Sequence, residues 1–260
     1  MGTLNRIMKT VCGYGLLVLL VVLPSCGDNE GGGNGSLPEW DKSKTMHIAV
    51  AGKTDGSSLL ASGEDDAGLL SLLRSRQSAT LLLKDCEVSY GNITVNPLVS
   101  LAYELRRIPV FGKGMPVEGG YSGNGFLLDH TLAAQTEKEV SGNCNIKSVE
   151  TFVTNNETLD AVLATLSVVN QEDVEQAAGA LASLLRDGTL VVGFMQNSWL
   201  EEFKAAVAQR VDGCRLETVT AYADGVSLFV LSSDKWVLRE SASEEEGAYM
   251  VSDLQVEQLY

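Results

Sequence analysis

Two histidines, His47 and His130, are the side chains of this sequence best suited to acid–base chemistry near neutral pH. An imidazole can take a proton from an attacking water and return it to a leaving group, provided that it lies within hydrogen-bond reach of both. His47 opens one apolar segment and His130 closes another, which places both at the ends of expected strands. No Ser-His-Asp or Cys-His set is evident around them. The sequence therefore argues against hydrolysis by an activated nucleophile.

Three cysteines, Cys86, Cys144 and Cys214, lie in the part of the chain that is expected to fold. An exported protein can form disulfides, but an odd number of cysteines leaves at least one thiol unpaired. Their spacing contains no Cys-x-x-Cys pair, so it does not predict a zinc site. We expect buried thiols, with a disulfide between two of the three as the alternative.

The N-terminal 25 residues have the pattern of a bacterial lipoprotein signal peptide. Arg6 and Lys9 precede the apolar run Leu16–Leu23, which is shorter than the roughly 20 residues that span a bilayer. The run ends in Leu-Pro-Ser followed by Cys26, which looks like a lipobox. We expect Cys26 to be diacylated and to anchor the protein to a membrane, since several acyl chains bind firmly. An ordinary signal peptide is the alternative.

Residues 26–45 are expected to form a flexible tether, because the Gly-rich stretch Gly31–Ser36 cannot bury apolar surface. Asp28 and Glu30, close behind Cys26, are similar to signals that send some lipoproteins to the outer leaflet. Solubility of the tether explains the same two acids equally well. We expect a location in the bacterial cell envelope, at the outer membrane, with the leaflet left open.

The charge of the predicted mature chain is strongly negative. The full sequence has 19 Lys and Arg against 34 Asp and Glu. Residues 1–25 contain two of these cations and no acid, so 17 cations remain against 34 acids, a net charge of −17. Affinity for nucleic acids comes largely from cations that neutralise phosphates. Nucleic acid is therefore not an expected partner, whereas a protein or a small molecule is.

Residues 46–260 are expected to fold as one domain, in which short apolar strands alternate with amphipathic helices. Strands are predicted at His47–Ala51, Thr80–Lys84, Ile108–Phe111, Asn124–Leu128, Ser148–Val153, Ala161–Leu166, Thr189–Met195, Ser227–Ser232, Trp236–Arg239 and Met250–Gln255. Helices are predicted at Ala67–Arg76, Pro97–Arg106, Gln171–Arg186 and Trp199–Arg210. Because most late strands follow one another directly, we expect two packed sheets with helices outside.

Three polar features have structural interpretations. Asn170 is expected to cap the helix Gln171–Arg186. The acidic run Glu64–Asp66 is expected to lead into a helix. Glu244–Glu246 is expected to be a solvated turn, with calcium binding as the alternative.

Several segments together resemble one enzyme family. The glycine-rich strand entry Gly119–Leu128, which contains Asn124, follows a helix and a strand. An apolar strand runs into the turn Gly193–Gln196, and the chain ends on Val251–Val256. This order resembles the endonuclease/exonuclease/phosphatase family, the metal-dependent phosphohydrolases related to DNase I. The resemblance covers nearly all of the folded part and implies a four-layer α/β sandwich of two mixed sheets flanked by helices.

At most of the positions where that family has working residues, this chain has other residue types. Lys53 stands in place of an Asn, Cys86 of the Glu that binds Mg²⁺, and Thr165 of a His. The remaining replacements are Phe194 and Gln196 in a Gly-Asp-Phe-Asn turn, Val226 in place of an Asp, and Leu254 in place of the final His. Asp253 is retained. A shift of one residue in the strand would offer Glu87 in place of Cys86, and only one register can direct a carboxylate to the site.

The replacements imply that catalysis is lost, because thiol, thioether, hydroxyl and aliphatic groups cannot bind a hard cation or activate water. The interpretation that we favour is a membrane-anchored binding or assembly module with no catalytic residues and no cofactor. One alternative is a residual hydrolase with Mg²⁺ or Mn²⁺ on Glu87, Asp85 and Asp253. Another is an unrelated α/β lipoprotein domain.

Overall fold

The computed structural model describes residues 44–60, 67–76, 78–89, 96–129, 132–154 and 158–259. The predicted signal peptide, Cys26, nearly all of the tether, Glu64–Asp66 and His130 lie outside these ranges. Within them, no helix has the length and apolar character needed to cross a membrane.

Two six-stranded sheets form the centre of the domain. In the first sheet the strand order is β11-β12-β1-β2-β4-β3, with β1 and β2 parallel and the other neighbours antiparallel. Its strands are β1 (Thr45–Lys53), β2 (Thr80–Ser89), β3 (Ile108–Val117), β4 (Gly120–Leu128), β11 (Trp236–Glu246) and β12 (Tyr249–Gln258).

The second sheet has the order β5-β6-β7-β8-β10-β9, and here β7 and β8 form the parallel pair. Its strands are β5 (Leu132–Ser141), β6 (Cys144–Thr154), β7 (Thr158–Val168), β8 (Leu190–Gln196), β9 (Arg215–Ala221) and β10 (Val226–Ser232). Each sheet therefore contains one parallel pair, and the segment that connects that pair includes a helix, as a parallel crossover requires.

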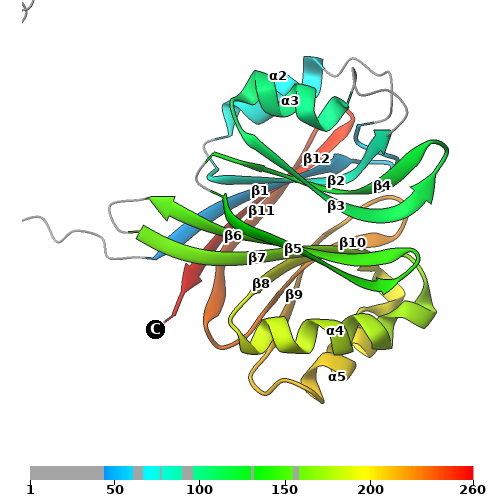
Figure 1. The fold of residues 1–260 in the computed structure, drawn as a ribbon, viewed down its shortest axis with the longest axis vertical. Helices are drawn as coiled ribbons and strands as arrows, with labels where there is room; N and C mark the ends of the chain where they lie inside the picture. The colour runs from blue at the N-terminus through cyan, green and yellow to red at the C-terminus, as the bar shows by residue number, and fades with distance from the viewer. Residues whose placement is uncertain are drawn as a thin grey trace, which may run out of the picture. The chain divides into compact units, whose positions relative to one another are not determined.

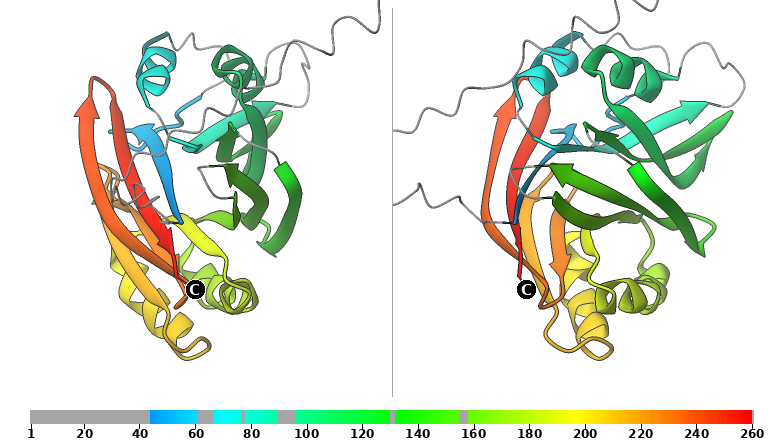
Figure 2. Two further views of the ribbon diagram at one scale, coloured as in Figure 1. Left: turned by 90° about the vertical axis from the view of Figure 1, so that its left-hand side faces the viewer. Right: turned by 60° about the vertical axis from the view of Figure 1, so that its left-hand side comes forward.

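Helices cover the outer face of each sheet, so that the domain has four layers (Figure 1). Helices α2 (Ala67–Ser75) and α3 (Pro97–Leu105) lie on the first sheet, and α4 (Val174–Arg186) and α5 (Leu200–Ala208) lie on the second. The two further views in Figure 2 show the same separation of the helix pairs. This arrangement confirms the predicted four-layer α/β sandwich.

Three apolar clusters hold the layers together. The first fills the space between the two sheets and includes Leu82, Phe126, Phe194 and Leu254. A second cluster packs α4 and α5 against one sheet, and a third packs α2 and α3 against the other. Alternate residues of a strand face opposite sides, so each central strand contributes to two clusters and reads as an almost continuous apolar run.

Two strands that the sequence did not predict, β5 and β9, lie at the edges of the second sheet. The central residues of β5 are exposed on both faces, and those of β9 alternate only between partly buried and exposed. Neither strand has the apolar alternation that marks a half-buried strand in a sequence.

Two local expectations were wrong. The side chain of Asn170 makes no capping hydrogen bond; its amide instead donates to Asp173 Oδ2 at 3.2 Å. A 3₁₀ turn, Gln171–Asp173, precedes α4. Glu244–Glu246 are the last residues of β11 rather than a turn, and the chain reverses at residues 247–248.

Candidate functional site

A break in the pairing of β2 with β4 creates the site. Leu83 is opposite Gly125 and Cys86 is opposite Gly123, so both Lys84 and Asp85 fall beside Asn124. Asp85 has a φ of 50°, in the left-handed region that few residues other than glycine adopt. A bulge of this kind redirects side chains and is common beside functional sites. Here it brings two consecutive charged side chains, Lys84 and Asp85, to the same end of the cleft between the sheets.

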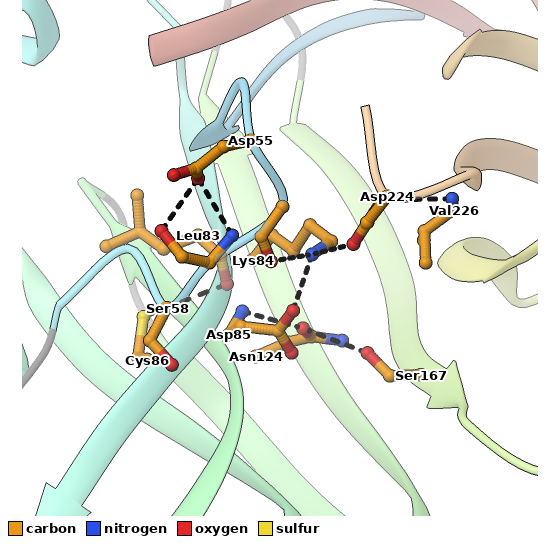
Figure 3. A network of polar contacts seen from close by, with 12 residues as sticks. Asp55, Ser58, Leu83, Lys84, Asp85, Cys86, Asn124, Ser167, Asp224 and Val226 are labelled. Atoms are coloured by element: carbon orange, nitrogen blue, oxygen red, sulfur yellow. Dashed lines mark hydrogen bonds and ion pairs between the residues drawn. The ribbon is translucent and has the colours of Figure 1, made fainter. Parts of the chain in front are cut away.

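The ammonium group of Lys84 is the centre of a polar network (Figure 3). Its Nζ lies 2.5 Å from Asp85 Oδ2 and 3.7 Å from Asp224 Oδ2, and it donates to the carbonyl oxygen of Gly56 at 3.2 Å. The ring of Tyr222 lies 5.1 Å from the same nitrogen. Only 3% of the Lys84 side chain is exposed, against 28% for Asp85 and 30% for Asp224. A buried ammonium is tolerated because two carboxylates and an aromatic ring surround it.

Asn124 links the two sheets behind this charge cluster. From β4 its Nδ2 donates to Thr165 Oγ1 on β7 at 3.1 Å, and its Oδ1 accepts from Ser167 Oγ at 3.2 Å. The same oxygen lies 3.4 Å from the backbone nitrogen of Asp85 and accepts from it. Asn124 is 3% exposed and Thr165 is 1% exposed. The amide thus fixes the backbone of the bulge relative to the second sheet.

Asp224 reaches the site from the turn between β9 and β10. Its Oδ1 accepts from the backbone N–H of Val226 at 3.0 Å, an Asx turn that orients the carboxylate, and Gly225 follows with a φ of 80°. Gln196 Nε2 donates to the Asp224 carbonyl oxygen at 3.4 Å. Gly56 lies so close that a Cβ there would overlap the Asp224 side chain. These contacts hold Asp224 beside Lys84.

Tyr222 closes the site on its inner side. It is 4% exposed and packs against Phe194 at a centroid distance of 6.3 Å. Its Oη has no hydrogen-bond partner among the described residues. Burial, and then the charges of Asp85 and Asp224, raise the pKa of Tyr222 above its ordinary value, so the phenol stays neutral.

A cavity of about 300 Å³ opens onto this network. Its polar lining consists of Lys84, Asp85, Asp224 and four serines: Ser57, Ser58, Ser122 and Ser167. Its apolar lining consists of Met115, Val168, Val169, Phe194 and Val226. Two of these apolar side chains are exposed to solvent, Met115 by 44% and Val169 by 38%. A concave site with apolar walls and a few convergent polar groups is typical of small-molecule binding.

Several of the replaced family positions meet at this cavity. Phe194 and Val226 line it, and Gln196 bonds to the lining residue Asp224. Thr165 lies one step further away, since it bonds to Asn124, which in turn bonds to Asp85 and Ser167 of the lining. Lys53 ends β1, three residues before Gly56 of the lining. These replaced positions therefore lie in or close to the region of the cavity.

Cys86 and Leu254 lie elsewhere. Cys86 is fully buried in the cluster beneath α2 and α3, where burial and then the charge of Asp85 raise the pKa of its thiol. Cys86 therefore faces away from the cavity, and the strand contributes Lys84 and Asp85 to the lining instead. Leu254 is buried in the core between the sheets. All three cysteines are free thiols, with Cys144 buried and Cys214 partly exposed.

Glu87, Asp85 and Asp253, the metal ligands of the alternative hydrolase interpretation, do not lie together in the structure. Asp253 pairs in register with Ala49, so it faces the helix side, where Arg76 Nη1 lies 2.5 Å from its Oδ2. Glu87 accepts from Ser58 Oγ at 2.9 Å, and Asp85 is paired with Lys84. Among the described residues no three His, Cys, Asp or Glu side chains form a group that could hold a metal ion. The residues present therefore do not fit the divalent cation of the family.

Sequence reasoning missed Lys84, Asp224 and Tyr222. Lys84 interrupts an apolar strand, and a charged residue inside a buried run is a signal that could have been followed. Asp224, in an Asp-Gly pair, reads as an ordinary turn residue.

Comparisons with solved structures show which fold this is. The endonuclease/exonuclease/phosphatase from Beutenbergia cavernae aligns with a TM-score of 0.60 at 10% identity, over 83% of this chain and 72% of that one. A family protein from Leptotrichia buccalis has a TM-score of 0.56 at 10% identity, over 81% and 99%. One from Bacteroides vulgatus has a TM-score of 0.56 at 9% identity, over 83% and 99%. No protein-family model and no curated protein matches the sequence.

Proposed function

The domain has the endonuclease/exonuclease/phosphatase fold, and with this as the starting point we propose that the protein is an envelope-anchored lipoprotein that binds a ligand in the cleft and does not hydrolyse phosphoesters. The observation that carries the proposal is the Lys84 ammonium between Asp85 and Asp224. The positive charge that pairs with these two carboxylates is a lysine side chain of the protein itself rather than a bound metal ion.

Electrostatics disfavours a metal beside this ammonium. Two like unit charges about 4 Å apart repel by about 4 kcal/mol at an effective dielectric constant of 20, and a divalent ion doubles that figure. A divalent ion must also be coordinated directly by several oxygen atoms, and the carboxylates of Asp85 and Asp224 are already paired with Lys84. A singly charged ammonium ligand meets half of this repulsion and needs only hydrogen-bond acceptors. Phosphoester hydrolysis in this fold requires a hard cation and an acid–base group near the phosphate. The lining residues that the structure describes include no histidine, and Thr165 is engaged with Asn124. A site without these groups can bind a molecule but lacks the means to activate water.

The proposed lipid anchor is inferred from the sequence. Cys26 follows an apolar run and precedes a Gly-rich segment, the order that diacylation and a tether require. Metabolic labelling with a radioactive fatty acid should mark the wild type and not Cys26→Ala. Equal labelling of both proteins would remove lipidation at Cys26 from the proposal.

Hydrolysis of bis(4-nitrophenyl) phosphate with Mg²⁺ or Mn²⁺ tests the binding function against the enzymatic one. We expect the full-length protein, purified in mild detergent, to give the same rate as buffer containing the metal. Asp85→Asn serves as the matched variant, since it removes one carboxylate and keeps the shape. Metal-dependent turnover by the wild type that Asp85→Asn abolishes would overturn the proposal.

A further inference from the structure

The side chains that line the cavity offer a ligand more hydrogen-bond acceptors than donors. An ammonium group has three donors and no acceptor. In Lys84 two of these donors bond to Asp85 Oδ2 and the Gly56 carbonyl oxygen, whereas Asp224 Oδ2, at 3.7 Å, is an ion-pair partner beyond hydrogen-bond distance. Lys84 is the one cation among the described residues of the lining, and two of its three donors are already used within the protein.

The carboxylates keep the acceptor capacity that Lys84 lacks. Each ionised carboxylate offers about four lone-pair positions. Among the described residues Asp85 is bonded through Oδ2 only, and Asp224 Oδ1 accepts a single backbone N–H. The serine hydroxyl groups of the lining can accept as well as donate. Free acceptors thus outnumber free donors around the cavity.

The net charge of the lining agrees with this inventory. One ammonium faces two carboxylates, and Glu87 lies next to the lining residue Ser58, to which it is hydrogen-bonded. Asp55, which accepts from the backbone N–H and the hydroxyl of Ser57, lies at the edge together with the cation Lys53, and the charges of these two residues offset each other. A partly enclosed negative site attracts cations and repels phosphates and carboxylates.

The apolar side chains of the lining indicate that the ligand also has an apolar part. Met115 and Val169 are largely exposed at the cavity, with Phe194 buried beside them. Exposed apolar side chains that gather at a concave site mark a surface that is covered when a ligand binds. A volume of about 300 Å³ is at the small end of ligand pockets and suits a compact molecule.

We propose that the cavity binds a small amphiphilic ammonium compound, with the charged nitrogen beside Asp224 and Asp85 and the apolar part against Met115 and Val169. This inference rests on the proposed binding function and names its ligand class. It also reverses the charge preference of phosphoester chemistry, since the ligand is a cation.

A set of four probes with one apolar body tests the ligand class. 4-Phenylbutylamine, 4-phenylbutan-1-ol, 4-phenylbutyrate and 4-phenylbutyl phosphate share the ring and the chain and differ in the head group. Each is titrated into the full-length ¹⁵N-labelled protein in detergent, and the amide signals of Lys84, Asp85, Ser122 and Ser167 are followed. The amine is expected to shift them with at least about tenfold higher affinity than the other probes, since charge complementarity decides between them.

Two cavity variants, Asp224→Asn and Val169→Lys, and one control, Glu201→Gln, test whether the amine binds in the cavity. Asp224→Asn keeps the oxygen that accepts from Val226 and removes the charge, so it should weaken amine binding by about tenfold. Glu201→Gln, an exposed position of α5, removes the same charge elsewhere and should leave amine binding unchanged. Val169→Lys places a cation at a position that is already 38% exposed, so it tests the same point without risk to the core.

The results separate this inference from the proposed function. Tighter binding of the phosphate, the carboxylate or the alcohol at the same signals would overturn the ammonium class and leave a binding module in place. Shifts by none of the four probes would overturn the ligand class, while the phosphodiester assay would still decide the binding function against the enzymatic one. An amine effect that Asp224→Asn and Val169→Lys leave intact would also overturn the inference, because it would place the amine elsewhere.

Discussion

Asn124 on β4 donates a hydrogen bond to Thr165 on β7 at 3.1 Å, and this contact joins the two sheets of the sandwich at the end where the charge cluster lies. Both side chains are buried, so each depends on the other to satisfy its hydrogen-bonding groups. The bond therefore positions the bulge that carries Lys84 and Asp85 relative to the second sheet.

Asn124→Ala should lower the free energy of unfolding by about 2–3 kcal/mol, because it leaves Thr165, Ser167 and the Asp85 N–H without a partner. Thr165→Val should cost less, since it removes only one of the bonds. Urea denaturation of both single variants and the double variant gives the coupling energy. A coupling close to zero would show that the contact does not hold the sheets together.

Gly123→Ala should destabilise the β3–β4 pair. A Cβ at Gly123 would lie 2.0 Å from the carbonyl oxygen of Gly112 and 2.8 Å from the backbone nitrogen of Gly114. Backbone atoms cannot move aside as a side chain can, so we expect a loss of about 3 kcal/mol in a denaturation experiment. Gly142→Ala is the matched control, because a Cβ there meets nothing within 4 Å. Equal stability of the two variants would contradict the packing described here.

Asp253 is expected to act in structure rather than in binding. Arg76 contacts Asp253 and Glu244 on the β11–β12 hairpin, and these acids, despite an opposing effect of burial, raise the pKa of the guanidinium. Asp253→Asn should cost about 1 kcal/mol, since both partners retain some contact with solvent, and the loss should shrink at high salt. Phenylbutylamine binding should not change. A large change in that binding would place Asp253 at the site after all.

The thiols should differ in reactivity and should make stability depend on alkaline pH. Burial, and then the charge of Asp173, raise the pKa of Cys144 from 9.0 to about 12. The folded state thus keeps a proton that the unfolded state loses above pH 9.0, and stability is lost as the pH rises from 9.0 towards about 12. The slope is at most about 1.4 kcal/mol per pH unit for one group.

Urea denaturation between pH 7 and 11 checks this slope. Cys144→Ala should reduce the slope but not abolish it, because burial also raises the pKa values of Cys86 and Tyr222. Of the three thiols, only Cys214 is partly exposed. A thiol reagent at pH 8 should therefore modify Cys214 first. Rapid modification of Cys86 or Cys144 in the folded protein would contradict their burial.

The sequence predicted the layered fold because the central strands bury both faces and the helices bury one face each. Leu190–Gln196 reads as an apolar strand since it faces two clusters, and Val174–Arg186 has a clear apolar stripe. The edge strand β5 was missed because its exposed residues carry no such pattern. Edge strands are stabilised by backbone pairing, which composition does not reveal.

Part of the cavity lining could be anticipated from the sequence, but the charge cluster could not. The turn Gly193–Gln196 was singled out in the sequence, and its Phe194 lines the cavity. The bulge at Lys84 and Asp85 was not foreseen, because a strand read as regular assigns Cys86 to the wrong face. Asp224 comes close to Lys84 only through the tertiary fold, 140 residues further along the chain.

The central claim is that the Lys84 ammonium takes the place of a divalent cation. Its most direct test is a titration of Mn²⁺ into ¹⁵N-labelled wild type and Lys84→Gln, followed by the paramagnetic broadening of the Asp85 and Asp224 signals. Glutamine can still donate to the Gly56 carbonyl oxygen but leaves two carboxylates uncompensated. We predict no broadening of these signals in the wild type at millimolar Mn²⁺, and broadening at about tenfold lower concentration in Lys84→Gln. Equal broadening in both proteins, or broadening in the wild type alone, would contradict the claim.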